Sequence, residues 1–393
     1  MKKILIYAPL IGGHRQVYCN VITHWALESK MDVILCIGND WCRGGNTISQ
    51  GSPYIDLYIT NNNVDFINAI QKPPQKSDSE YLLDLENNIK PDLIFVISGD
   101  EFNHSLYSFM KDLIIPKRHS SKWVGIFIAC FYYPDSANWL KQRVQKFILK
   151  QKLKYFDRTY WLDEYFVNNT NSKNKFWLPD ISKSFNISVN NDDAEFELLC
   201  PQIDNFLINN KGKDVLLFFG RDFNRKGFDF IIELALEDEQ FVVLRAGDPL
   251  ENMDESQEIM EKMSILEKNG RLLNIPKFIE NPIIIGKLFQ STNYILLPYR
   301  DHYSSSGVML QAIEFQKPVV VPNIGLMGKR VFENHLGITY KHKKYDEFKK
   351  AVYKMQNEYY NYIPYTITFY ESFSKEAIFK RLDLLMQEIN KCK

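Results

Sequence analysis

Short apolar runs alternate with longer amphipathic stretches along the first half of the chain. Several of these runs are apolar on consecutive residues, which is typical of strands covered on both faces of a parallel sheet. The predicted strands are residues 3–9, 32–37, 54–59, 93–98, 123–129 and 158–162, and the predicted helices are residues 15–28, 80–88 and 138–155. This alternation predicts a parallel sheet with right-handed crossovers.

The second half repeats the alternation after the polar stretch Asn186–Glu195, which we predict to be a linker. The predicted strands are residues 214–219, 241–246, 272–275, 294–298 and 318–321, and the helices are residues 228–236, 255–268, 283–290 and 308–315. The apolar spacing of residues 369–393 predicts one amphipathic helix. The pattern therefore predicts an α/β fold with Rossmann-like domains at residues 1–185 and 200–365 and a C-terminal helix within 366–393.

Composition narrows the class of protein. The chain has 393 residues with 48 basic and 48 acidic side chains, and a net charge of zero argues against nucleic acid as a partner. No apolar stretch of about 18 residues is present to span a bilayer. The apolar start runs into Gly-Gly-His-Arg rather than a cleavage site, which favours a first strand over a signal peptide. Six cysteines without paired spacing fit a cytoplasmic protein.

Two stretches of the second half combine the features of an anion site. Gly220 and Arg221 follow an apolar strand, and Lys226 and Gly227 come shortly after them. Farther along, the strand 294–298 leads into a helix whose first turn, residues 304–307, is Ser-Ser-Ser-Gly. Unpaired amides at a helix start and two basic side chains can converge on one diphosphate. The alternatives are a solvated basic turn and ordinary N-capping by serine.

Residues that follow strands of the first half are candidates for substrate contacts. Gly12 and Gly13 permit close approach of a ligand to the backbone, and His14 is a candidate proton carrier or hydroxyl contact. Asp100 and Glu101 stand at the carboxyl end of a predicted strand, where they can bind acceptor hydroxyls or act as a base. The alternatives are a surface or capping role for His14 and N-capping by Asp100.

The stretch 139–158 predicts a basic amphipathic helix. It carries seven basic residues against the single acid Asp157, and apolar residues interleave with them at helical spacing. Such a helix suits an anionic membrane surface, which would place the protein at the periphery of the inner face of a membrane. The alternative is a core helix with a solvated basic face, and the exposure of Trp139 or Phe147 distinguishes the two.

Several chemistries lack their signatures. The sequence contains no HExxH, no CxxC, no clustered histidines and no DxD between apolar residues, so we predict no metal site. Residues 12–16 break the GxGxxG pattern, which argues against a nicotinamide enzyme. A GxSxG elbow and a Walker loop are absent too.

The second half resembles the GT-B glycosyltransferases, most closely the retaining family 4, through motifs that occur in the family's order. These motifs are Leu216-Leu-Phe-Phe-Gly220-Arg221 with Lys226-Gly227, Val242-Val-Leu-Arg-Ala-Gly247-Asp248-Pro249, Leu296-Leu-Pro298-Tyr299, Ser305-Ser306-Gly307-Val-Met-Leu-Gln311-Ala312 and Lys317-Pro318-Val-Val-Val. The segment Phe369–Phe373 is similar to the family's closing aromatic helix. The family's two glutamates eight positions apart are replaced here by Tyr303 and Gln311.

The resemblance implies a GT-B fold, in which two Rossmann-like domains face a central cleft and a C-terminal helix crosses back to the N-terminal domain. It implies a hexosyltransferase-type enzyme that moves a sugar from a nucleoside diphosphate sugar to a saccharide or lipid-linked saccharide acceptor, as in polysaccharide biosynthesis. The implied transfer is retaining and metal-independent, with no cofactor besides the donor. A front-face transfer of this kind needs no protein base, because the departing phosphate can take the acceptor's proton.

The resemblance also implies roles for individual residues. Arg221 and Lys226 would neutralise the diphosphate, while His14 and Asp100 would act on the donor and the acceptor from the N-terminal domain. Gln311 or Glu314 would hold the ribose. The full set of implied donor-binding residues is Gly12, Gly13, Gly247, Asn274, Ser305, Ser306, Gly307, Val308, Gln311 and Glu314.

Two other functions remain open at this stage. A nucleotide-sugar epimerase of the same double-Rossmann shape would act without any acceptor. A non-catalytic binder of sugar or nucleotide is favoured by the missing glutamate pair. A nicotinamide oxidoreductase is the weakest alternative, because the glycine fingerprint is incomplete.

Overall fold

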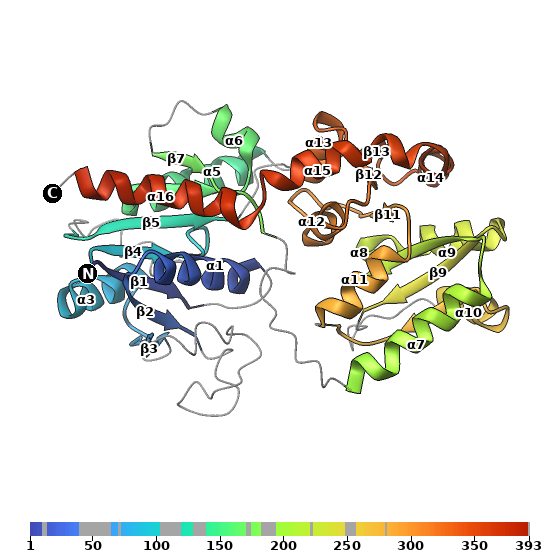
Figure 1. Cartoon of the computed structure of the whole chain (residues 1–393). Coiled ribbons are helices and arrows are strands. Elements are labelled where there is room, and N and C mark those ends of the chain that lie inside the picture. Colours follow the sequence, from blue (N-terminus) through green and yellow to red (C-terminus); the bar gives the residue numbers. More distant parts are fainter. Residues whose placement is uncertain are drawn as a thin grey trace. The chain divides into compact units, whose positions relative to one another are not determined.

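The computed structural model describes residues 1–9, 14–38, 64–69, 72–102, 119–128, 139–169, 174–181, 194–220, 223–247, 257–279 and 281–391. These residues form two compact units (Figure 1). The N-terminal unit contains the described residues up to 181 together with those from Phe373 onward. The C-terminal unit contains the described residues from 194 to Ser372.

The N-terminal unit is built on one parallel sheet of seven strands, in the order β3-β2-β1-β4-β5-β6-β7. The strands are β1 (Lys3–Ala8), β2 (Asp32–Ile37), β3 (Asp65–Asn68), β4 (Leu93–Val96), β5 (Lys122–Phe127), β6 (Arg158–Trp161) and β7 (Lys175–Trp177). Five of the six predicted strands are confirmed, and the predicted strand 54–59 lies outside the described residues. The order reverses between β1 and β4, which makes their carboxyl ends the topological switch point.

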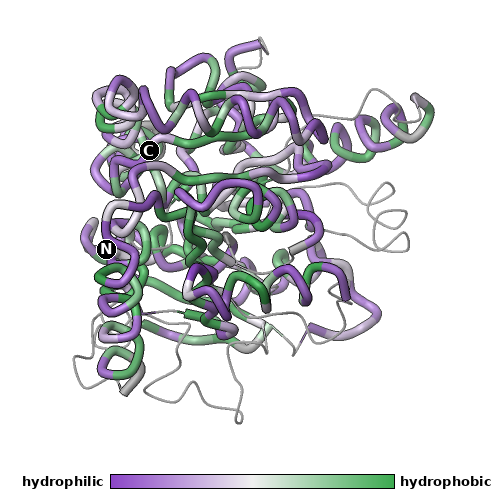
Figure 2. Tube along the Cα trace, turned by 90° about the vertical axis from the view of Figure 1, so that its right-hand side faces the viewer, coloured by the Kyte–Doolittle hydropathy of each residue, from purple (hydrophilic) through white to green (hydrophobic). Residues whose placement is uncertain are grey.

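Helices cover both faces of this sheet, which explains its consecutive apolar residues. They are α1 (His14–Glu28), α3 (Asp78–Ile89), α5 (Trp139–Lys152) with a 3-10 turn at Leu153–Tyr155, α6 (Glu164–Asn168) and α16 (Lys375–Lys391). Successive residues of a strand point to opposite faces. Ile4 and Ile6 pack with α1 and α16, whereas Leu5 and Tyr7 pack with α3 on the other face. Figure 2 shows hydrophobic and hydrophilic residues alternating along the helices, as one-sided burial requires.

The C-terminal unit contains two parallel sheets, ordered β10-β9-β8 and β11-β12-β13. Their strands are β8 (Asp214–Phe219), β9 (Phe241–Ala246), β10 (Leu272–Ile275), β11 (Ile295–Leu296), β12 (Val319–Pro322) and β13 (Gly337–Tyr340). β8 and β11 lie side by side, and Leu216, Leu296 and Val320 share one core. The strand order 10-9-8-11-12-13 again reverses in the middle, so the switch point lies at the carboxyl ends of β8 and β11.

The helices of the C-terminal unit agree closely with the sequence pattern between residues 228 and 315. The helices are α7 (Ala194–Asn209), α8 (Phe223–Lys226), α9 (Phe228–Glu237), α10 (Gln257–Lys268), α11 (Pro282–Gln290), α12 (Gly307–Glu314), α13 (Gly325–Glu333), α14 (Tyr345–Glu358) and α15 (Ile363–Glu371). The sequence prediction did not include α7, α13, α14 or β13. Of the predicted linker, residues 186–193 lie outside the described residues, and α7 begins at Ala194.

The prediction of one helix over residues 369–393 is wrong. The tail forms two helices, α15 and α16, which are separated at Ser372–Ser374. The hydroxyl of Ser374 accepts from the Ala377 amide at 3.2 Å and so starts a new helix, while Phe373 packs against Trp177. In the N-terminal unit, the Trp25 indole donates to Asp383 of α16 at 3.0 Å. Because Phe373 continues the apolar spacing of the tail, the sequence pattern gave no sign of the break between the two helices.

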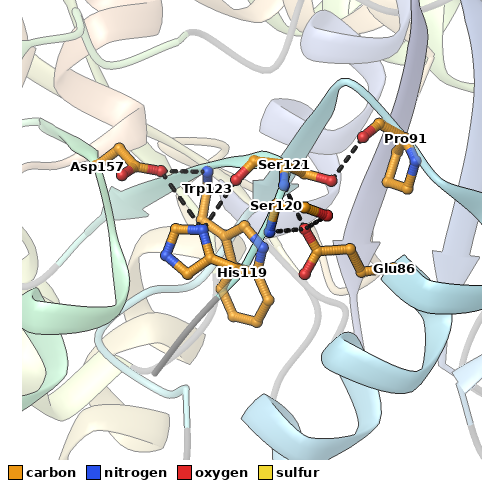
Figure 3. Close-up of polar contacts among 7 residues, drawn as sticks. All are labelled: Glu86, Pro91, His119, Ser120, Ser121, Trp123 and Asp157. Atoms are coloured by element: carbon orange, nitrogen blue, oxygen red, sulfur yellow. Dashed lines mark hydrogen bonds and ion pairs between the residues drawn. The ribbon is translucent and has the colours of Figure 1, made fainter. Parts of the chain in front are cut away.

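A buried carboxylate holds the segment that enters β5 at the amino end of the sheet (Figure 3). Glu86 of α3 is buried and accepts from the amide and hydroxyl of Ser120, at 2.8 and 3.0 Å, and from the Ser121 amide. Next to it, His119 stacks on Trp123, whose amide donates to Asp157. Because this network lies at the opposite end of the strands from the switch point, its role is structural.

Glu86→Ala is expected to destabilise the N-terminal unit by about 2–3 kcal/mol, because the buried Ser121 amide loses its partner. Asp84→Ala, on the same helix, removes only a half-exposed ion pair with Lys76 and should change stability by less than about 1 kcal/mol. All six tryptophans lie at or before residue 177, so their fluorescence in urea follows this unit. Equal midpoints for the two variants would contradict the structural role of Glu86.

Candidate functional site

The carboxyl end of β8 holds an ammonium group. Lys226 ends the short helix α8, is 92% buried, and donates from Nζ to the Phe219 carbonyl at 3.0 Å. A Cβ on Gly220 would lie 2.2 Å from this Nζ and would displace the ammonium, and the φ of +107° at this position also favours glycine. Within the described part of the chain, no carboxylate pairs with Lys226. The charge is therefore available to an anion at the switch point.

The loop after β11 contacts the turn that carries Arg225 and Lys226, which is called the basic turn below. The Arg300 amide donates to the Arg225 carbonyl at 2.7 Å, and the ring centroid of Tyr299 lies 5.5 Å from the Lys226 ammonium. Arg225 Nη1 lies 3.0 Å from His302 Nδ1. Because a guanidinium only donates, His302 Nδ1 accepts, and its Nε2–H donates to the Ser305 carbonyl at 3.0 Å. His302 thus joins the basic turn to residues 304–307, which are called the serine turn below. The structure therefore brings these two predicted features together.

Hydrogen bonds from within the C-terminal unit fix the serine turn. Ser306 is the N-cap of α12, and its Oγ accepts from the Met309 amide at 3.3 Å, as the capping alternative predicts. The Oγ of Ser305 accepts from Arg330 Nη1 at 2.7 Å, and Arg330 is completely buried. A hydroxyl that accepts one bond still has its own hydrogen to donate. Both serines can therefore donate to an anion in front of Gly307 and Val308, the first residues of α12.

The two ribose candidates occupy the later turns of α12. Gln311 is buried, and Glu314 accepts from the Tyr370 hydroxyl at 3.3 Å. Glu314 thus has an internal partner, and the assignment of the ribose to Gln311 or Glu314 stays a prediction.

The candidates for the nucleoside base lie at the ends of neighbouring strands. The Gly247 amide donates to the Ile275 carbonyl at 3.1 Å, which brings together the carboxyl ends of β9 and β10. Asn274 accepts from the buried Arg245 guanidinium through its side-chain oxygen. Asp248 lies outside the described residues.

Three of the predicted site residues are not described at all. Arg221, Gly12 and Gly13 lie outside the described residues. His14 begins α1, but only its backbone is described. The roles of these four residues stay predictions.

The switch point of the N-terminal unit carries the two predicted acids. Arg15, in the first turn of α1, forms an ion pair with Glu101 and so links the ends of β1 and β4. The Asp100 carboxylate accepts from the Ile128 amide at 3.2 Å, just beyond β5. Burial raises the pKa of Asp100, although this hydrogen bond opposes the shift. A carboxyl with a raised pKa at a strand end is suited to act as a general base.

Sequence reasoning missed the residues that support the site rather than contact a ligand. Arg225, His302 and Arg330 hold the serine turn, and His342 Nε2 accepts from the Asp301 amide at 3.1 Å. Burial lowers the pKa of His342, which favours the neutral acceptor. Arg225 directly precedes Lys226 in the sequence and could have been found there. Arg330 could not, because its partner Ser305 is 25 positions earlier in the sequence.

The described residues lack a metal-binding cluster and a membrane-spanning helix. They contain no group of three or more His, Cys, Asp or Glu side chains placed to hold a metal ion. Among them, too, no helix has the length and apolar content that crossing a membrane requires.

No family model and no curated protein matches this sequence. Solved structures do match its fold. The chain is similar to a sucrose-phosphate synthase from Thermosynechococcus elongatus, with a TM-score of 0.65 and 13% identity over 100% of both chains. It is also similar to Anabaena HepE in complex with UDP, with a TM-score of 0.64 and 10% identity over 99% of this chain and 100% of that one.

An epimerase has a similar fold as well. The UDP-GlcNAc 2-epimerase from Neisseria meningitidis, bound to UDP-GlcNAc, matches with a TM-score of 0.61 and 13% identity over 99% of this chain and 100% of that one. The fold alone therefore does not separate transfer from epimerisation. What the similarities do show is the architecture: the predicted α/β fold class, with two Rossmann-like domains of the GT-B type, is confirmed.

Proposed function

We propose that the protein is a glycosyltransferase that takes its sugar from a nucleoside diphosphate sugar, in the manner of the retaining family 4. One observation carries the proposal: among the described residues no carboxylate pairs with the Lys226 ammonium at the switch point, and His302 ties the same turn to the start of α12. A ligand in an open parallel sheet binds at this edge. The matched glycosyltransferase structures support this reading, because Anabaena HepE holds UDP.

The proposed chemistry uses fixed positive charge. As the bond between sugar and diphosphate breaks, negative charge grows on the leaving phosphate, and preorganised donors stabilise it. Lys226, the amides at Gly307 and Val308, and the hydroxyls of Ser305 and Ser306 supply these donors, with Arg221 as a further predicted cation. Because these donors already neutralise the diphosphate, we propose that the transfer needs no metal. The acceptor hydroxyl would attack the anomeric carbon from the face that the departing phosphate leaves, and this phosphate would take the hydroxyl's proton. Attack on that face gives a retaining transfer.

The acceptor is proposed to be a saccharide or a lipid-linked saccharide. Asp100 and Glu101 lie at the switch point of the N-terminal unit, and carboxylates there can bind sugar hydroxyls. Ionised Asp100 is the candidate to orient the attacking hydroxyl.

A thermal-shift screen against UDP, GDP, dTDP and CDP tests the donor assignment. A nucleoside diphosphate at about 100 times its dissociation constant should stabilise the folded protein by about 2.7 kcal/mol. For a unit of this size, that corresponds to a rise in melting temperature of roughly 5–10 °C. If all four nucleotides at millimolar concentration left the melting temperature unchanged, the proposal would be rejected.

The second candidate function is nucleotide-sugar epimerisation, which the match to the Neisseria epimerase favours. The two reactions differ in their need for an acceptor. Incubation with UDP-GlcNAc alone, followed by NMR, should show an unchanged sugar nucleotide if the protein is a transferase. Accumulation of the 2-epimer in the absence of any acceptor would establish the epimerase instead.

A further inference from the structure

Helix α5 exposes four of its six apolar residues. Trp139, Leu140, Val144 and Phe147 are 64%, 55%, 50% and 52% exposed. At about 100° per residue, these four side chains fall within an arc of roughly 140° on one side of the helix. An exposed row of this kind, with a tryptophan and a phenylalanine in it, contradicts the alternative in which α5 turns its apolar side to the core.

The opposite side of α5 fixes the helix to the N-terminal unit. Leu149 and Leu153 pack against the cluster that contains Trp123 and Phe156. Lys152 is buried, and its Nζ donates to the Asp100 carbonyl. The orientation of α5 is therefore set by packing, and the exposed row lies on the side away from this core.

Positive charge lies along one edge of the exposed row. Helix α5 has five basic residues and no acidic one. Arg143, Lys146 and Lys150 are exposed, and the Arg143 guanidinium lies 5.2 Å from the ring centroid of Trp139. Basic side chains of this length can reach toward water while their neighbours enter an apolar phase.

We propose that α5 docks the protein on the surface of an anionic lipid bilayer. Trp139, Leu140, Val144 and Phe147 would enter the boundary between headgroups and acyl chains, and the exposed basic residues would bind lipid phosphates. The charge pattern disfavours a second copy of this chain, because a two-fold interface would set the basic residues against themselves. The inference does not depend on the proposed sugar transfer.

Docking would also bear on the position of the acceptor. The Asp100 carbonyl accepts from Lys152, at the end of α5, so the helix is attached to the turn that carries the acceptor candidates Asp100 and Glu101. If transfer occurs, a membrane-bound helix would hold this turn near the lipid surface, which suits a lipid-linked acceptor.

Co-sedimentation with vesicles tests the docking. The full-length protein should sediment with phosphatidylcholine vesicles that contain about 30% phosphatidylglycerol, and not with phosphatidylcholine alone. Arg143→Gln/Lys146→Gln/Lys150→Gln should lower the partition coefficient on the order of 100-fold. Trp139→Ala/Phe147→Ala should lower it as well. Since all five side chains are exposed, the variants should keep their urea midpoints.

A matched control variant distinguishes the effect of where the basic residues lie from the effect of the protein's net charge. Lys349, Lys350 and Lys354 lie on α14 of the other unit, and their replacement by glutamine changes the net charge equally. That variant should bind vesicles like the wild type, and all variants should keep their thermal response to UDP. The inference is overturned if the wild type ignores anionic vesicles, or if the α14 variant loses as much binding as the α5 variant. A dimer in sedimentation velocity that Trp139→Ala/Phe147→Ala dissociates would also overturn it.

Discussion

Lys226→Met is expected to weaken UDP binding by roughly 10- to 100-fold, the equivalent of one lost charge-assisted hydrogen bond. Methionine keeps most of the unbranched stem against its buried surroundings and removes only the charge. The lost ammonium sits at the end of β8, and in the described part of the chain it pairs with no carboxylate and donates to the Phe219 carbonyl. Isothermal titration calorimetry of the wild type and the variant measures the difference directly.

Lys262→Met serves as the control for this experiment. Lys262 lies on α10 and is paired with Glu233 and Glu258, so its charge is already balanced. The control should bind UDP like the wild type. Unchanged affinity in Lys226→Met, with UDP still binding tightly to the wild type, would show that the diphosphate lies elsewhere.

The alternation of strands and helices was predictable because burial on both faces leaves a direct mark on the sequence. β8, β9 and β10 match their predicted ranges residue for residue, since each strand is a short apolar run between polar turns. β13 was missed because its sequence, Gly-Ile-Thr-Tyr, has few apolar residues and begins with a glycine, which is uncommon in strands.

The candidate site was predictable where function depends on local geometry. Ser306 and Gly307 mark a helix start, and Gly220 and Lys226 mark the end of a strand, because these features are written in neighbouring residues. The contacts that hold the site residues in place were not predictable. The link from Arg225 through His302 to Ser305, and the contact of Arg330 with Ser305, join segments that only the fold brings together.

The contact between α8 and the loop after β11 depends on the glycine between α8 and α9. Gly227 has φ of +70°, and a Cβ there would lie 2.1 Å from the Pro298 carbonyl oxygen. Pro298 directly precedes Tyr299, against which the Lys226 ammonium lies. The position therefore controls both the backbone of the basic turn and its distance from the serine turn.

Gly227→Ala is expected to destabilise the C-terminal unit by about 2–5 kcal/mol, the sum of left-handed strain and a forced shift of neighbouring backbone. Gly270→Ala is the matched control, because Gly270 has φ of +65° and a Cβ there meets nothing within 4 Å. It should lose only about 1–2 kcal/mol. Circular dichroism follows both units and tryptophan fluorescence only the N-terminal one, so their difference in urea reports the C-terminal unit.

Gly227→Ala should also lose UDP affinity, because the shift of the backbone separates Lys226 from the start of α12. Equal losses of stability in the two variants would mean that Gly227 is needed for its backbone angle alone and that the approach of Pro298 is relieved without strain.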